Sequence, residues 1–112
     1  MANVYKNIQA KITSAGSYDD MYTAPAETTS IVKTIKLFNT HGSSLDVLIK
    51  VYDASGTTDY EYDIANVTSN DGVDLLTFNN ILILEAGDKI KMKCATGNVI
   101  KMTAAVLQTS RT

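Results

Sequence analysis

The segment Asp88–Cys94, DKIKMKC, has the clearest β-strand pattern of this 112-residue chain. Lysine occupies every second position of the segment, and Ile90, Met92 and Cys94 fill the positions after each lysine. Because successive side chains of a β-strand leave on opposite faces, this alternation predicts a strand with one buried and one solvated face. Cys94 falls on the apolar face, which predicts a small buried hydrophobic residue rather than a reactive thiol.

The same period of two recurs along the rest of the chain. Leu45–Val51 places four aliphatic residues on one face, and Asp59–Ile64 alternates three acidic residues with two tyrosines and an isoleucine. Less regular patterns, rich in β-branched and aromatic residues, predict further strands at Val4–Ile12, Ser30–Asn39, Val73–Phe78, Asn80–Glu85 and Asn98–Gln108, with a short strand at Ser17–Thr23. The runs at 73–78 and 80–85 fit strands that are buried on both faces.

Turn signals rich in Gly, Asn, Asp and Ser separate these segments, for example at 40–44, 54–56, 70–72 and 96–98. About eight strands at this spacing predict an all-β fold, an antiparallel β-sandwich with jelly-roll or Ig-like connections. A closed barrel is the alternative. The length suits one domain over residues 1–112, because two independent cores would be difficult to build from so few residues.

Composition excludes several classes of function. The net charge is −2, so no basic surface indicates nucleic acid or an anionic membrane as a partner. The longest apolar run, Ile81–Leu84, has four residues, whereas about 18 are needed to span a bilayer. The first residues lack a charged region followed by an apolar stretch, so no secretory signal is expected. A single cysteine excludes an intrachain disulfide.

The residue types needed for catalysis are scarce. His41 is the only histidine, and it lies in a Gly/Ser-rich segment that reads as an ordinary turn. Nucleophilic catalysis usually needs a base oriented by a third group, and no such arrangement can be assembled from the sequence pattern. Neither a phosphate-binding glycine loop nor a zinc-ligand spacing occurs. The sequence therefore predicts no catalytic, cofactor-binding or metal-binding residue.

Two charged rows are the candidate functional feature. One expected strand carries a row of basic side chains on one face, and another carries a row of acidic side chains with the same two-residue spacing. We predict that they form an interface, either with each other or with a partner protein; the residues are Lys89, Lys91, Lys93, Asp59, Glu61 and Asp63. The alternative for the lysines is protection of an exposed strand edge. For the acidic row, the alternative is a calcium site in which Asp19, Asp20 or Asp71 adds further ligands from neighbouring loops, although a straight strand cannot wrap around an ion.

Three segments together resemble small structural proteins of tailed bacteriophages. They are Tyr22–Ile35 (YTAPAETTSIVKTI), Leu37–Ser43 (LFNTHGS) and Leu84–Thr96 (LEAGDKIKMKCAT). The final strand of that family ends in alternating small and apolar residues, as Met102–Leu107 does here. The resemblance extends over about residues 3–108. The chain departs from the family pattern at Cys94, where a small residue is usual, and in its acidic 59–63 strand.

The resemblance implies a non-enzymatic virion protein with a β-sandwich fold, assembled in the host bacterial cytoplasm. It implies a capsid decoration (cement) protein that stabilises the particle by protein–protein contacts, with major capsid or tail proteins as partners. It also implies a homo-oligomer, with a trimer preferred. A tail, neck or fibre component that binds a receptor or carbohydrate is the alternative. Tyrosines suit both functions, because they serve sugar stacking and protein interfaces alike.

Overall fold

The computed structural model describes residues 3–76 and 80–110, which form nine strands separated by turns and bends. The strands are β1 (Asn3–Lys11), β2 (Asp19–Thr23), β3 (Thr28–Asn39), β4 (Leu45–Asp53), β5 (Thr58–Val67), β6 (Asp71–Leu76), β7 (Leu82–Leu84), β8 (Lys89–Cys94) and β9 (Ile100–Ser110). Each predicted strand has a counterpart, and residues 77–78 of the predicted 73–78 strand lie outside the described residues. Within the described ranges there is no helix, and hence none that could cross a membrane.

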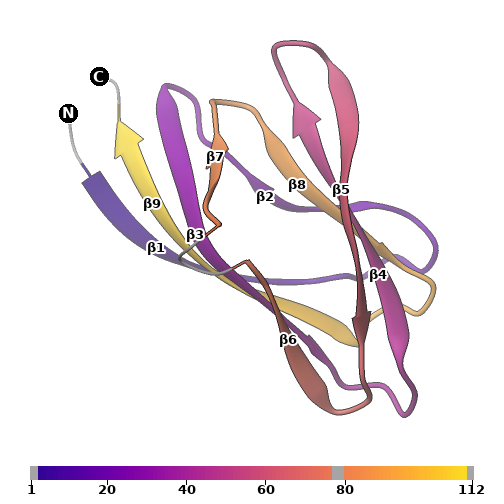
Figure 1. Ribbon diagram of the computed structural model, residues 1–112. Coiled ribbons are helices and arrows are strands. Elements are labelled where there is room, and N and C mark those ends of the chain that lie inside the picture. Colours follow the sequence, from indigo (N-terminus) through magenta and orange to yellow (C-terminus); the bar gives the residue numbers. More distant parts are fainter. Residues whose placement is uncertain (1–2, 77–79, 111–112) are drawn as a thin grey trace.

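The strands form two antiparallel sheets that face each other (Figure 1). The first sheet has the order β1-β9-β3-β6, with β7 also paired to β3, and the second has the order β2-β8-β4-β5. The pairs are nested along the chain: β1 with β9, β2 with β8, β3 with β6 and β7, and β4 with β5. A long hairpin folded over on itself produces this nesting, which is the jelly-roll topology. The predicted sandwich is confirmed, with jelly-roll connections, and the closed barrel is wrong.

The core lies between the two sheets and is built by the alternation seen in the sequence. In β8, Ile90, Met92 and Cys94 are at most 1% exposed, as predicted, and Val47 and Ile49 of β4 meet them from the neighbouring strand. The first sheet contributes mainly aliphatic side chains, among them Val32, Ile35, Leu37, Ile100, Met102 and Val106. Burying these chains removes apolar surface from water, the dominant favourable contribution to folding.

β-bulges explain why some strands show less regular sequence patterns. In β3, the register against β9 shifts between Val32 and Thr34, so buried positions are even-numbered before the shift and odd-numbered after it. In β2 a similar shift leaves both Met21 and Tyr22 buried. A bulge adds one residue to one strand only, and the alternation of faces changes at that point.

The runs at 73–78 and 80–85 do not form strands buried on both faces. β6 and β7 are edge strands that pair only with β3 among the described strands, and Ile83 is 58% exposed. Each is short, and each pairs with a different half of β3. Because an edge strand has a neighbour on one side only, short apolar runs here stay partly in contact with solvent.

Candidate interaction surface

The predicted lysine row lies on the outer face of the second sheet, the face turned away from the first sheet. Lys89, Lys91 and Lys93 point outward because the alternating residues of β8 point into the core. The side chains of Lys89 and Lys91 are only 31% and 22% exposed, so their stems lie along the sheet while their ammonium groups reach neighbouring side chains.

Two of the three lysines form ion pairs. Lys91 Nζ lies 3.3 Å from Asp59 Oδ1 of β5, a contact of the kind predicted between the two rows. Lys89 Nζ lies 3.0 Å from Asp20 Oδ2 of β2, so its partner is outside the predicted acidic row. No ion pair to Lys93 is found among the described residues. The basic row is therefore divided between acidic groups on two different strands.

Two tyrosine rings of this face form cation–π contacts with its lysines. Lys50 stands directly opposite Lys91 in the β4–β8 register, a like-charge pair that is unfavourable by itself. Lys50 Nζ lies 4.5 Å from the centre of the Tyr18 ring, and Lys93 Nζ lies 5.0 Å from the same ring. Lys91 Nζ lies 4.9 Å from the centre of the Tyr52 ring. The negative faces of these rings attract the ammonium groups and offset part of their mutual repulsion.

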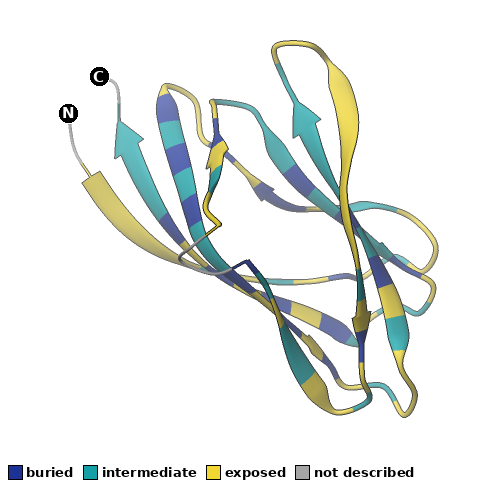
Figure 2. Ribbon diagram, in the orientation of Figure 1, coloured by how far each residue is buried: buried dark blue, intermediate teal, exposed yellow. Residues whose placement is uncertain are grey.

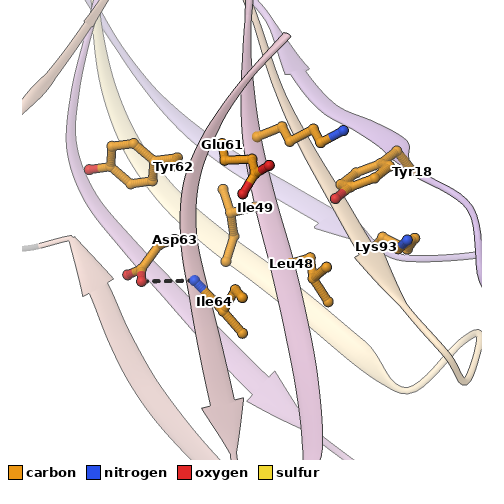
Figure 3. A pocket seen from close by; sticks show the side chains of 9 residues that line it. Tyr18, Leu48, Ile49, Glu61, Tyr62, Asp63, Ile64 and Lys93 are labelled. Atoms are coloured by element: carbon orange, nitrogen blue, oxygen red, sulfur yellow. Dashed lines mark hydrogen bonds between the residues drawn. The ribbon is translucent and has the colours of Figure 1, made fainter.

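The acidic residues of β5 do not share one face, contrary to the prediction. Glu61 pairs in register with Lys50 on the outer face, whereas Asp63 pairs with Ile49, which is buried in the core. Directly opposed residues of an antiparallel pair point to the same side, so Asp63 lies on the opposite side of β5 from Glu61. The cause is a bulge in which Tyr62 has no opposing residue. Figure 3 shows the two carboxylates pointing to different sides of β5.

Asp63 has a local role beside the bulge. Its Oδ1 accepts a hydrogen bond of 2.8 Å from the backbone N–H of Ile64. Burial raises the pKa of the neighbouring Tyr62, and the Asp63 carboxylate raises this pKa further. Asp63 therefore caps a main-chain donor at the bulge and is not part of the charged row.

A pocket of about 340 Å³ lies beside this bulge, between β5 and the group formed by Tyr18, Lys50 and Lys93. Its lining combines apolar, cationic and acidic residues from both sides of β5 and from the neighbouring strands (Figure 3): Tyr18, Leu48, Ile49, Lys50, Glu61, Tyr62, Asp63, Ile64 and Lys93. The volume is at the lower end of the range for small-molecule sites.

The other singled-out residues have structural roles. Cys94 is 1% exposed, as predicted. His41 lies in the β3–β4 turn, where its Nδ1 is 3.3 Å from the backbone N of Ser43. Asp19 accepts backbone hydrogen bonds from Thr13 and Ser14, which lower its pKa. Within the described ranges, no three acidic, cysteine or histidine side chains are grouped so that they could hold a metal ion.

Sequence reasoning gave Lys50 no role in this surface, considered Asp20 only as a calcium ligand, and named the tyrosines as interface residues without placing Tyr18 and Tyr52 beside the lysine row. The alternation in 45–51 already placed Lys50 and Tyr52 on the outward face of their strand. What the sequence lacked was the order of the strands, which puts β8 between β2 and β4.

Comparison with known proteins shows the fold. No protein-family model matches the chain, and no curated protein is similar to it. A solved structure of Bacillus endospore appendages, described as a family of disulfide-linked pili, superposes with a TM-score of 0.59 at 11% identity, covering 98% of this chain and 89% of that one. This likeness supports the β-sandwich assignment.

Two looser likenesses have TM-scores below 0.5. The CBM22-1–GH10 modules of a Clostridium thermocellum xylanase give 0.43 at 10% identity, covering 98% of this chain and 26% of that chain. A pentameric capsid protein from metagenomic phage sequences gives 0.37 at 13% identity, covering 91% and 60%. At this level of similarity they add nothing to the fold assignment.

Proposed function

We propose that this chain is a non-enzymatic structural protein of a bacteriophage virion, and specifically a capsid decoration protein that stabilises the particle by protein–protein contacts. The observation that carries the proposal is the outer face of the second sheet. Its lysines, tyrosines and carboxylates are held in a fixed array by ion pairs and cation–π contacts on a sheet surface. The phage resemblance of the sequence, on a jelly-roll sandwich, supports the virion assignment.

The array is suited to partner selection rather than to stabilising the chain itself. An exposed ion pair contributes about 0–1 kcal/mol to folding, and a cation–π contact about 0.5–1 kcal/mol at an exposed site. Charged groups at an interface act mainly on register and partner choice, since unlike surfaces attract and wrong partners meet like charges. We propose that the lysine row, with Asp59 and Glu61 beside it, meets a complementary surface of the major capsid protein.

The test is rebinding to virions. Particles of the encoding virus assembled without this chain would be mixed with the purified chain, and the bound copies counted by mass spectrometry and imaging. A decoration protein should bind at a regular, saturating copy number on the head and raise the temperature at which particles release their genome. Lys93→Glu should weaken binding, whereas Lys36→Glu on the first sheet should not. Absence of the chain from purified virions would contradict the proposal.

The pocket favours a second candidate, a tail, neck or fibre component with a receptor- or carbohydrate-binding role. Tyrosines and carboxylates beside an open pocket are suited to hydroxyl-rich ligands. Binding of the isolated chain to a glycan array, lost in Glu61→Ala, together with labelling of tails rather than heads, would favour this candidate over decoration.

A further inference from the structure

Two sheet edges of this fold are long. β1 and β5 have nine and ten residues, whereas the opposite edges are β2, with five residues, and the two short strands β6 and β7. Residues Asn3–Lys11 pair with β9 without a register break, whereas the bulge at Tyr62 divides β5 into the segments 58–61 and 63–67. An edge strand presents unpaired N–H and C=O groups that can pair with another strand, and short or interrupted edges limit this pairing.

The outward backbone groups of β1 can be assigned. Ile12, directly after the strand, donates its N–H to Ile100 of the β9 strand. Because hydrogen-bonded and non-hydrogen-bonded pairs alternate in an antiparallel ladder, the odd-numbered residues of β1 direct their N–H and C=O groups away from β9. Asn7 is the central one of these residues, and no described strand lies against it on that side.

The same two edges carry most of the exposed apolar side chains. Among the described residues, eight large hydrophobic side chains are exposed, and five of them lie on these strands: Val4, Tyr5, Tyr60, Tyr62 and Ile64. Tyr5 is 72% exposed and Ile64 is 64% exposed. Figure 2 shows β1 and the first part of β5 as mostly exposed strands. Long edges that expose apolar side chains can pair with another strand unless something covers them.

The charges of the two edges are opposite. β1 contains Lys6 and Lys11 and no acidic residue, whereas β5 contains three acidic residues and no basic one. Two copies of β1, or two copies of β5, would bring like charges together. A pairing of β1 with β5 brings unlike charges together, so the electrostatic contribution favours this combination over either symmetric one.

The two edges also lie on opposite sides of the sandwich, β1 beside β2 and β5 beside β6 (Figure 1). We propose that the β1 edge of one copy pairs with the β5 edge of a second copy, joining the first sheet of one to the second sheet of the next. The segment before the bulge, residues 58–61, supplies the straight part of the β5 edge. Such a head-to-tail contact repeats from copy to copy and ends in a closed ring or an open chain. It rests on the proposed function and deepens it by naming the self-assembly contact.

The test uses two variants that each block one edge. Asn7→Pro removes an outward N–H from β1 without touching the β9 ladder, and Glu61→Lys reverses a charge of β5 that has no intrachain ion pair among the described residues. Association would be measured by light scattering over a dilution series. The parent should form oligomers, and each variant alone should associate about tenfold or more weakly. Mixed together, they should form a complex of two chains, because the free β1 of one variant meets the free β5 of the other.

Matched controls keep the outcome clear. Asn7→Ala loses the side chain but keeps the backbone N–H, so it should associate like the parent, and circular dichroism confirms that each variant is folded. If Asn7→Pro does not fold, Lys6→Glu takes its place. A monomeric parent, an unaffected variant, or a mixture that fails to form the two-chain complex would each overturn the inference. Binding of a monomeric chain to virions would leave the proposed function intact while the inference fails.

Discussion

Asn39→Ala tests how the two sheets are joined at one end of the sandwich. Asn39 is the last residue of β3, and its side chain is fully buried. Its Nδ2 donates to the carbonyl oxygens of Val67 and Ser43 at 2.9 and 3.0 Å, and its Oδ1 accepts the N–H of His41 at 2.8 Å. Val67 ends β5 in the second sheet, so this one amide links both sheets and the turn between them.

The loss follows from these three bonds. The bond to Val67 is buried, and leaving a buried acceptor unpaired costs about 1–3 kcal/mol. The other two bonds are partly buried, and each contributes about 0.5–1.5 kcal/mol. Asn39→Ala should therefore lower the free energy of unfolding by about 3 kcal/mol. For a domain of this size this corresponds to a fall in Tm of roughly 10–20 °C.

The assay is unfolding in urea, monitored by circular dichroism. The slope of the free energy of unfolding against urea concentration should be the same in the variant and the parent. Asn66→Ala is the matched control, because Asn66 makes a single exposed bond, to Asp46 at 2.8 Å. The control should lose less than about 1 kcal/mol. If Asn39→Ala loses no more than Asn66→Ala, the side chain does not join the sheets as described.

Three further changes have defined outcomes. Tyr22→Phe removes the partner of the fully buried Ser30 hydroxyl, 2.8 Å away, and should cost about 1–3 kcal/mol by thermal unfolding; no change in Tm would contradict the bond. Lys91→Glu should cost at most about 1 kcal/mol and be partly rescued by Asp59→Lys in the same chain, measured as a double-mutant cycle. Hydrogen bonds from the backbone lower the pKa of Asp19 in the folded chain. The carboxylate therefore stabilises the fold at pH values above 3.8, the ordinary pKa of the group, and this contribution is lost as the pH falls through the lowered pKa of the folded state. Asp19→Asn should flatten the acid side of the stability curve, and an unchanged curve would refute this role.

The residue pattern alone was enough to predict where the strands lie, the inward faces of β4 and β8, and a β-sheet structure without long helices over residues 3–76 and 80–110. Alternation in 45–51 and 88–94 depends only on the two-residue period of a strand, so it is visible without knowing any partner. The burial of Cys94 follows from the same pattern. These features are local, and local preferences and the hydrophobic pattern are enough to specify them.

The pairing of the strands and the positions of the bulges depend on contacts that form only in the folded chain. Two antiparallel sheets are compatible with several chain orders, and the nested jelly-roll pairing is set by contacts between residues far apart in the sequence. The strand from 59 to 64 alternates perfectly, yet the bulge at Tyr62 turns Asp63 away from Glu61. A bulge exists only relative to an opposing strand, here β4, so no pattern within β5 reveals it. For the same reason Lys89 pairs with Asp20: strand order places β2 beside β8, and charges interact with the neighbours that the fold provides.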